Sequence, residues 1–519
     1  MPAQLHVVFG VSNLGSTSDT STHGFLSMIR KLQLTKVHHP VELTYDGDGL
    51  RIEGDFNAAK RGKPSYTCFC IPLPPPKRAD PLLLPIQNTN ILRVCYNERL
   101  KMVEIHALIP MQHDKEDSLL ELYKFMYSLS DNNEEEAKQF CKDLMHDVYK
   151  DMKPEKRLKV IVNPAGGQGK AKDIFEFGVK PVFEAANCEM DIQYTEHQGH
   201  ALQIAKDLDI NRYDAIVTVS GDGIIHEVIN GFLQRPDARQ AIKNVPLGLI
   251  PGGTSNSLSI CLLDYVRGYD PVYSALQVIK GQNLALDLCS VTYADHRYFS
   301  FLSQNHGITA YADLATEHLR WMGDTRNIIG LMQQIFARQS YPVEVALQIE
   351  ESNKERIKSK YRDALVHPVR PPLNELDGPV VDTIPPLSEP VPEDWTVIND
   401  DLVFFLTSKV PSVARDMLTH PCALPNDGLI DALFVRGHPS IAKQMEIFKK
   451  IEHGQHIDSP LVEYYKVKAF RFTPKAPAGK KAYTVIDGEN APNQPFQVQV
   501  HSRLGCVLSL YPTFKNSNI

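Results

Sequence analysis

The stretch "SGDGIIHEVINGF", Ser220–Phe232, decides how the central part of this chain folds. It follows "YDAIVTV", residues 213–219, whose β-branched and apolar residues predict a buried strand. Apolar residues at helical spacing begin directly after the second glycine. Glycines allow close backbone approach, and the first N–H groups of a helix are free. A strand that passes through glycines into a helix is therefore typical of an anion-binding site.

Strands and helices alternate around this stretch, from Arg157 to Ile260. The pattern predicts strands over 157–164, 188–197, 213–223 and 245–253, and helices over 171–186, 200–209 and 224–234. Such alternation is typical of a parallel sheet that carries helices on both faces. In these sheets ligands bind beyond the carboxyl ends of the strands.

Three of the predicted strand ends are rich in glycine: "NPAGGQGKA" from Asn163, "SGDG" from Ser220 and "PGGTSNS" from Pro251. A fourth strand ends in "TEHQGHA", from Thr195. Because these ends share one edge of the sheet, we expect a cradle for nucleotide phosphates there. The first segment is neither a P-loop, since G-K-[ST] is missing, nor a G-x-G-x-x-G dinucleotide fingerprint.

Asp222 needs a separate explanation, because a carboxylate beside phosphate-binding amides repels phosphate. It fits if it contacts a metal ion or a substrate hydroxyl whose proton must leave. Glu227, in the helix that follows, is expected to support it. The alternative is that Asp222 only caps that helix.

The first 154 residues have a different character, with short strands, "DGDG" and "PPPK" turn signals, and then one amphipathic helix within 131–152. Strands are expected over 4–11, 41–47, 49–54, 65–73, 91–97 and 102–109. Strands followed by a single helix resemble a pleckstrin-homology module at the level of fold. A generic β-rich extension is the alternative.

Composition excludes some functions and leaves others open. The net charge of −7 gives no general attraction to nucleic acid, and none is expected as a partner. Nine cysteines are scattered, and only Cys68 and Cys70 are close, so we expect no zinc site and a reducing, cytosolic compartment. No apolar run approaches the length of a membrane span, so contact with intracellular or plasma membranes is expected to be peripheral. The oligomeric state stays open, a dimer included.

Several segments resemble known motifs. "VNPAGGQGKA", "SGDGIIHEVING" and "PGGTSNSLS" resemble the nucleotide-site motifs of the diacylglycerol kinase superfamily, and "YTVIDGE", residues 483–489, is similar to its late Asp-Gly-Glu motif. "HGITAYADLATEHLRWMGDTRNIIG", residues 306–330, resembles the corresponding segment of sphingosine kinases. The resemblance covers roughly 157–350 and 400–512 and excludes the first 150 residues.

The resemblance implies a chain of two catalytic lobes. An α/β lobe over 155–285 would bind ATP, and a β-rich, antiparallel sandwich-like lobe over 286–515 would hold lipid. Strands that alternate after residue 340 agree with this. A Pro-rich insertion at about 352–398 is expected to be a solvated, disordered loop.

The resemblance also implies residue roles. Asp222 would take the proton from the lipid hydroxyl, with Asp487 as the alternative base, and Mg²⁺ would join ATP through water on Glu489 without a local metal motif. The nucleotide and its phosphates would be bound by Asn163, Gly166, Gly167, Gly169, Thr195, Ser220, Gly221, Gly223, Glu227, Gly253, Thr254, Asn256, Arg320, Arg326, Asp487, Gly488 and Glu489.

The segment 313–323 predicts a helix on which Asp313 shares a face with Glu317, and Arg320 lies three residues further on. The ammonium group of a sphingoid base needs a buried acceptor or anion, and a phosphate-transfer site needs arginine. The resemblance assigns the ammonium to Asp313 and phosphate to Arg320 and Arg326. A charged helix surface is the alternative. Tyr311 replaces one of the family's paired acidic residues, which leaves Asp313 as the candidate for the amine.

The function expected is therefore transfer of the ATP γ-phosphate to the primary hydroxyl of sphingosine, dihydrosphingosine or phytosphingosine. The alternatives are a ceramide or diacylglycerol kinase, an NAD kinase, or an inactive lipid-binding scaffold. The chain lacks the Cys/His-rich modules of typical animal diacylglycerol kinases and the cysteine cluster of ceramide kinases. Nothing in the sequence indicates which base is preferred.

Overall fold

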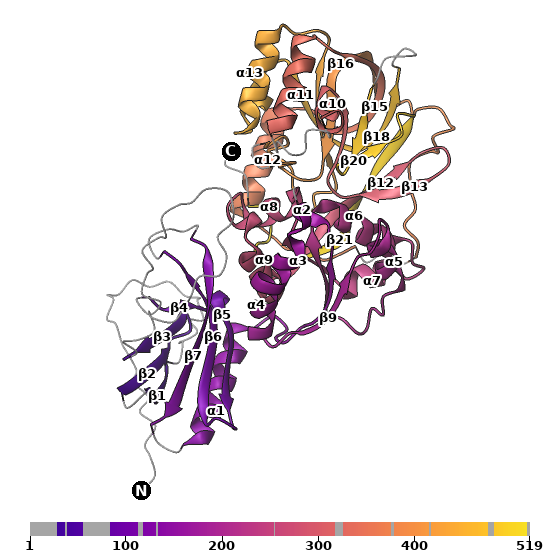
Figure 1. Ribbon diagram of the computed structural model, residues 1–519. Coiled ribbons are helices and arrows are strands. Elements are labelled where there is room, and N and C mark those ends of the chain that lie inside the picture. The colour runs from indigo at the N-terminus through magenta and orange to yellow at the C-terminus, as the bar shows by residue number, and fades with distance from the viewer. Residues whose placement is uncertain are drawn as a thin grey trace, which may run out of the picture. The chain divides into compact units, whose positions relative to one another are not determined.

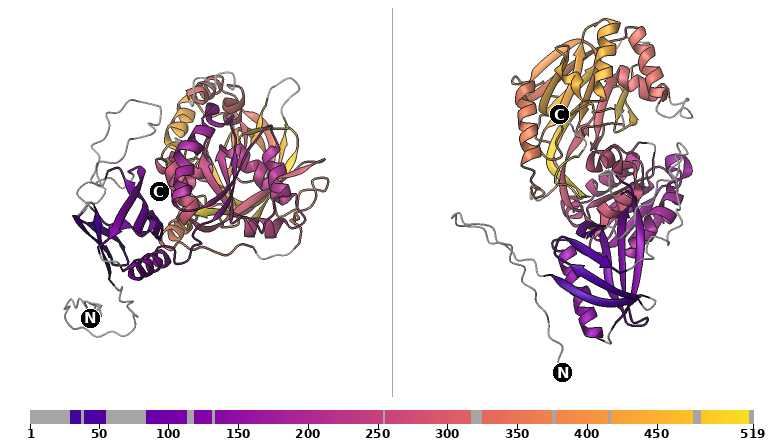
Figure 2. Two further views of the ribbon diagram at one scale, coloured as in Figure 1. Left: turned by 60° about the horizontal axis from the view of Figure 1, so that its bottom comes forward. Right: turned by 90° about the vertical axis from the view of Figure 1, so that its left-hand side faces the viewer.

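The structure is a computed structural model that describes residues 29–36, 39–54, 84–112, 118–130, 133–253, 255–316, 325–374, 378–414, 417–475 and 482–515. Contacts between residues divide the chain into two compact units (Figures 1 and 2). One comprises Met1–Glu155 and Lys180–Cys188, and the other comprises Lys156–Val179 and Glu189–Ile519. Among the described residues, no helix is both long and apolar enough to cross a bilayer.

The first unit holds a seven-stranded antiparallel sheet in the order β4-β3-β2-β1-β7-β6-β5. Two meanders are joined where β1 pairs with β7. The strands are β1 (Arg30–Lys36), β2 (His39–Tyr45), β3 (Gly49–Glu53), β4 (Ile86–Gln87), β5 (Ile91–Asn97), β6 (Met102–Pro110) and β7 (Leu120–Leu129). The strands expected over 4–11 and 65–73 lie outside the described residues.

One amphipathic helix, α1 (Glu134–Val148), follows this sheet as predicted. The Asn133 side chain accepts from the N–H of Glu136 and caps the helix, and acidic residues fill the first turn. The buried stripe includes Phe140 and Leu144 and packs against β5. The described part of this region therefore consists of one antiparallel sheet followed by one helix.

The second unit begins with the predicted parallel strands β8 (Arg157–Val162), β9 (Glu189–Tyr194), β10 (Ala215–Ser220) and β11 (Leu247–Pro251), in the order β11-β10-β8-β9. Figure 1 shows α5 and α7 on one side of these strands and α3 and α9 on the other. The helices are α2 (Gly166–Gly169), α3 (Ala171–Asp173), a π-helical turn (Ile174–Val179), α5 (His200–Asp207), α6 (Asp222–Leu233), α7 (Ala238–Asn244), α8 (Ser257–Leu263) and α9 (Pro271–Lys280). The helix α4 (Lys180–Ala185) follows the π-helical turn in sequence but belongs to the first unit.

The rest of this unit is mainly antiparallel, as predicted. Its sheet continues into the parallel strands, because β21 pairs in parallel with β11 at Val507 and Leu247. The strands are β12 (Gln282–Thr292), β13 (Arg297–Ser300), β14 (Ser303–Gly307), β15 (Tyr341–Glu351), β16 (Thr396–Ser408), β17 (Ile430–Arg436), β18 (Val462–Pro474), β19 (Thr484–Ile486), β20 (Glu489–Ala491) and β21 (Phe496–Ser509). The helices are α10 (Ile308–Leu314), α11 (Thr325–Phe336), α12 (Lys354–Val366) and α13 (Ile441–Ile451).

The prediction of a disordered Pro-rich loop at 352–398 is wrong. Its first part forms α12, and the described residues from 378 onward form an extended segment packed on the sheet, with Trp395 buried. Arg471 donates to the carbonyls of Pro385, Pro386 and Glu389, which anchors the segment. Proline already restricts the unfolded chain, so ordering such a segment loses little entropy.

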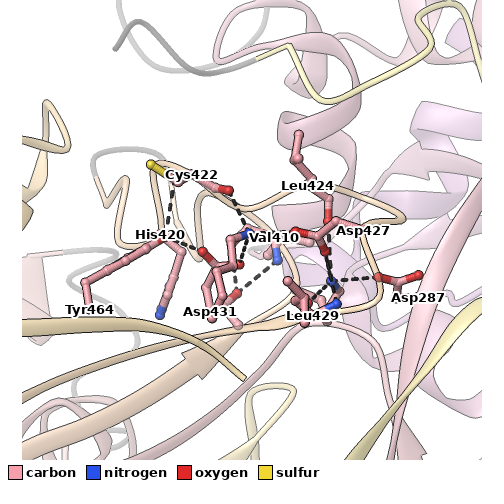
Figure 3. A network of polar contacts seen from close by, with 12 residues as sticks. Asp287, Val410, His420, Cys422, Leu424, Asp427, Leu429, Asp431 and Tyr464 are labelled. Atoms are coloured by element: carbon pink, nitrogen blue, oxygen red, sulfur yellow. Dashed lines mark hydrogen bonds and ion pairs between the residues drawn. The ribbon is translucent and has the colours of Figure 1, made fainter. Parts of the chain in front are cut away.

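The antiparallel part of the second unit contains a buried network of charged side chains (Figure 3). Lys409 Nζ lies 2.9 Å from Asp287 and 3.2 Å from Asp427, and Lys466 Nζ lies 2.8 Å from Asp427 and 2.7 Å from Asp431. Burial alone would lower the pKa of Lys466, but the surrounding carboxylates outweigh it and raise that pKa. Each charge therefore depends on its partners, and the network fixes the chain between β16 and β17 against β12 and β18.

Candidate active site

The three glycine-rich turns meet at one edge of the parallel sheet. Val219 is in register with Val162 on one side and with Ile250 on the other, so the three strands end level. The N–H of Asn163 donates to Val219 O at 3.2 Å, and the N–H of Gly252 donates to Ser220 O at 3.0 Å. The convergence predicted from the sequence is confirmed.

The glycines are needed because these turns touch backbone to backbone. A Cβ on Gly253 would lie 2.4 Å from the nitrogen of Gly221, and one on Gly167 would lie 2.4 Å from the carbonyl oxygen of Gly252. Gly167 also has a positive φ of 57°, which disfavours any other residue. The glycines therefore allow the turns to pack against one another into one surface of backbone groups.

Polar side chains from the strand ends complete this surface. Asn163 donates from Nδ2 to Ser220 Oγ at 3.3 Å, and its Oδ1 accepts from Thr195 Oγ1 at 3.5 Å. The Asn256 side chain bonds both the N–H and the carbonyl of Gly253. The structure thus brings five predicted nucleotide residues into contact with one another, whereas Thr254 lies outside the described residues.

Asp222 is 4% exposed and joins two of the turns. Its Oδ2 accepts from Ser257 N at 2.8 Å and from Ser255 Oγ at 3.0 Å, and among the described residues its Oδ1 accepts only from Leu258 N, at 3.4 Å. Burial raises the pKa of Asp222, although these hydrogen bonds oppose the rise. Asp222 therefore caps the start of α8 and not its own helix α6. One of its oxygens keeps a single long hydrogen bond.

The expectation that Glu227 supports Asp222 is wrong, because the observed hydrogen bonds of Glu227 go elsewhere. Its Oε1 accepts from Gly199 N at 2.9 Å and its Oε2 from Ala201 N at 3.0 Å, at the start of α5. Residues five apart on a helix do not share a face, which explains why the two carboxylates diverge. Glu227 instead positions the turn that follows β9.

Asp487 lies in the late Asp-Gly-Glu turn with both carboxylate oxygens occupied. Oδ1 accepts from Ser300 Oγ at 2.6 Å and from the N–H groups of Leu302 and Ser303, each at 3.0 Å. Oδ2 accepts from Phe301 N at 3.1 Å and faces His226 Nδ1 at 2.9 Å. The carboxylate thus fastens the turn to β13, β14 and α6.

His226 is the functional residue that the sequence reasoning missed. Burial lowers the pKa of His226, but its hydrogen bond to Asp487 and that carboxylate's charge outweigh burial, so the pKa is raised. The only signal available was a histidine four residues after Asp222, on the same face of α6. Its partner lies 261 residues further along the chain.

Glu489 lies over the start of α6. A Cβ on Gly223 would lie 3.5 Å from Glu489 Oε1, which places this carboxylate next to the turn that carries Asp222. Among the described residues, no group of three or more His, Cys, Asp or Glu side chains is arranged to hold a metal. Mg²⁺ keeps most of its waters and uses one or two carboxylates, so Glu489 suits it.

Most of the residues predicted to contact the lipid lie outside the residues that the structure describes. α10 ends at Leu314, earlier than the helix expected over 313–323, and residues 317–324 are not described. The structure therefore does not describe Arg320 or the side chains of Asp313 and Arg326. Tyr311 is described, and its ring lies edge-on to that of Tyr483, with centroids 5.7 Å apart.

Both halves of the second unit match known protein families. Residues 157–291 match the family described as diacylglycerol kinase catalytic domain, and residues 408–508 match the family described as YegS C-terminal NAD kinase beta sandwich-like domain. These matches fall on the parallel part with the three turns and on the antiparallel part with the late motif.

Three relatives extend the likeness over most of the chain. Sphingoid long chain base kinase 4 of Schizosaccharomyces pombe is 33% identical over 386 residues, covering 72% of this chain and 80% of that protein. Sphingoid long chain base kinase 5 of Saccharomyces cerevisiae is 32% identical over 462 residues, covering 78% and 66%. Sphingosine kinase 1 of Homo sapiens is 33% identical over 368 residues, covering 68% and 91%. The chain belongs to the sphingosine kinase family of lipid kinases, the sphingoid long chain base kinases, as its motifs had suggested.

Proposed function

We propose that this protein transfers the γ-phosphate of ATP to the primary hydroxyl of a sphingoid base. The observation that carries the proposal is the meeting of three glycine-rich turns above Asp222, in a chain 33% identical to a sphingoid long chain base kinase over 80% of that protein. The reported relatives are named for sphingoid bases, which does not favour the ceramide, diacylglycerol or scaffold alternatives.

The triphosphate would lie against the backbone of the three turns, where N–H groups and small residues allow close approach. Gly166, Gly167 and Gly169 would face the phosphates, with Asn163, Thr195 and Ser220 beside the nucleotide. Gly221, Gly223, Gly253, Thr254 and Asn256 complete the proposed set from the other two turns. Glu227 contributes indirectly, through its bonds to the start of α5.

Asp222 is the proposed general base, because Asp487 has no free oxygen in the structure. The Asp222 Oδ1 atom accepts one bond of 3.4 Å, while the Asp487 oxygens accept bonds from one hydroxyl and three amides and also face His226. A carboxylate whose pKa is raised by burial is a stronger base, as proton abstraction near neutral pH requires. Asp487 and Gly488 would hold the turn that presents Glu489. When bound through Glu489, Mg²⁺ would offset the charge that develops on the phosphates.

The lipid is proposed to bind with its ammonium group facing Asp313. Arg320 and Arg326 would bind the phosphates, for which the planar guanidinium is suited. An N-acylated base carries no charge on its nitrogen and brings a second chain. Ceramide is therefore expected to be a poor substrate.

The outer parts of the chain are assigned by the same reasoning. An ATP-binding lobe over 155–285 and a lipid-binding lobe over 286–515 would share the sheet that runs from β9 to β20. The β-rich region over 1–154 is proposed to be pleckstrin-homology-like, supported by two antiparallel meanders followed by one helix. Peripheral contact with membranes would bring the lipid within reach.

A lipid panel tests this proposal. Purified protein with ATP and Mg²⁺ is offered sphingosine, dihydrosphingosine, phytosphingosine, ceramide or diacylglycerol, and phosphorylated lipid is quantified. We expect phosphate on the three free bases and little on the other two. Efficient phosphorylation of ceramide or diacylglycerol would show that the protein acts on another class of lipid. Absence of any product would favour a lipid-binding scaffold.

A further inference from the structure

His306, at the fourth position of β14, has one ring nitrogen without a hydrogen-bond partner among the residues that the structure describes. The residue is 2% exposed, and the nitrogen concerned, Nε2, is buried. Buried polar atoms in native proteins are almost always paired, and an orphan is destabilising unless something else completes it. A ligand group is one way to complete it.

The bonds of the other ring nitrogen define what Nε2 can do. Thr484 donates its hydroxyl proton to Asn493 Oδ1 at 3.3 Å, so the hydroxyl oxygen accepts from His306 Nδ1 at 3.1 Å. The proton of the neutral ring is therefore on Nδ1, and Nε2 carries a bare lone pair. Burial lowers the pKa of His306 to about 4, which keeps the ring neutral. The structure thus presents a buried acceptor that lacks a donor.

Aromatic side chains surround this acceptor. The ring of Phe472 lies 4.7 Å from that of His306, and the ring of Tyr341 lies edge-on at 5.7 Å. Burial raises the pKa of Tyr341 to about 12, and the nearby phenols of Tyr311 and Tyr483 add to the effect. The Tyr341 hydroxyl is bonded to Gln334 Oε1 at 3.2 Å and so is already engaged.

His306 lies on the strand that contacts the late Asp-Gly-Glu turn. Gln304, two residues earlier and on the same face of β14, donates to Ser300 Oγ at 2.7 Å, and Ser300 donates to Asp487 at 2.6 Å. Two residues along a strand span about 7 Å. His306 therefore lies about 7 Å along β14 from a residue that is linked through Ser300 to Asp487.

We propose that His306 accepts a hydrogen bond from a chain hydroxyl of the sphingoid base, at C3 or C4, and thereby selects hydroxylated bases. The inference rests on the proposed function. It adds a residue that recognises the second hydroxyl, separate from the groups assigned to the phosphates and the ammonium.

A hydroxyl suits this position better than the ammonium does. An ammonium buried against a neutral imidazole and aromatic rings needs a counter-ion, and no carboxylate bonds to His306 among the described residues. A neutral hydroxyl donates one hydrogen bond to Nε2 and needs no counter-ion. Without that donor, the acceptor stays unpaired in the complex, which is the basis on which a site rejects an analogue that lacks one hydroxyl.

The test compares three bases that share the primary hydroxyl and the amine: phytosphingosine, dihydrosphingosine and 3-deoxydihydrosphingosine. With wild-type protein, kcat/KM should fall at least about tenfold at one step of this series, and the step identifies the hydroxyl at C4 or C3. In His306→Phe that step should vanish, because use of the hydroxylated base falls while use of the base lacking that hydroxyl is kept. The unfolding free energy of the variant should change little, because the variant loses the Nδ1 hydrogen bond to Thr484 but also removes an unpaired buried acceptor.

His420→Phe is the matched control. His420 is equally buried, but its Nδ1 is bonded to Thr419 Oγ1 at 2.9 Å and its Nε2 to Leu406 O at 3.3 Å. This control should lose stability and keep the wild-type selectivity. Wild-type protein that uses all three bases alike overturns the inference without any variant. A His306→Phe variant that keeps the wild-type ratio, or that loses all three bases equally, overturns it as well. Phosphorylation of none of the bases refutes the proposed function itself, and the inference with it.

Discussion

Replacing Asp222 by Asn separates the two roles that the structure gives this carboxylate. As the general base, its loss should lower kcat by about 10²–10⁴-fold. As the cap of α8, an asparagine can offer its oxygen to Ser257 N and Ser255 Oγ, but then turns its amide nitrogen toward Leu258 N, a second donor. That mismatch should lower the unfolding free energy by about 1–3 kcal/mol.

The assay follows lipid phosphorylation, nucleotide affinity and urea unfolding on the same preparations. We expect Asp222→Asn to bind ATP nearly as wild type does and to fail in transfer. Ser255→Ala is the control, because it removes one donor to the carboxylate and leaves the carboxylate in place. It should lose similar stability and stay within about tenfold of wild-type turnover. Near-normal turnover of Asp222→Asn would indicate that Asp487 is the general base. Equal rate losses in both variants would indicate that Asp222 has only a structural role.

Three further predictions follow from burial and charge. Lys466→Met should lower the unfolding free energy in urea by about 3–5 kcal/mol, because it leaves two buried carboxylates with one lysine fewer. The exposed Lys468→Met should change the unfolding free energy by less than about 1 kcal/mol, and equal effects would contradict the network's role. The fold raises the pKa of His226, so His226 stabilises the protein fully below its ordinary pKa and loses that contribution as pH rises through the raised one. The difference in unfolding free energy between wild type and His226→Gln should thus be larger near about pH 5.5 than near about pH 9. A difference that does not change with pH would contradict this role of His226. Asp313→Asn should lower sphingosine phosphorylation at least about tenfold with little change in ATP hydrolysis or melting temperature, and full activity would remove its assignment to the amine.

The parallel half of the fold was predictable from the sequence because buried parallel strands are continuous apolar runs, as in 157–162 and 215–220. Three strands of the first unit, β1, β4 and β7, were not predicted: β4 has only two residues, and charged and polar residues lie among the apolar residues of β1 and β7. The C-terminal strand β21 is continuous over Phe496–Ser509. It passes through Arg503 at a positive φ and an irregular pairing with β12, a local distortion that a periodicity argument takes for a turn.

The site was predictable where neighbours in the sheet determine it, and not where distant segments do. The three glycine-rich turns meet because adjacent parallel strands end together. By contrast, Glu227 bonds to the start of α5, and Asp487 to His226, through positions that no local spacing reveals. The Pro-rich segment was misjudged for the same reason. Its anchor, Arg471, lies more than 80 residues away.

A competition between two acceptors in one reaction shows whether the protein phosphorylates a free sphingoid base. The protein receives γ-labelled ATP, Mg²⁺ and equal amounts of dihydrosphingosine and its N-acyl derivative, and mass spectrometry identifies the labelled lipid and the position of the phosphate. We expect label on the primary hydroxyl of the free base, and the N-acyl lipid should remain nearly unlabelled. Label on the N-acyl lipid at a comparable rate, or phosphate on any other group of the base, would contradict it.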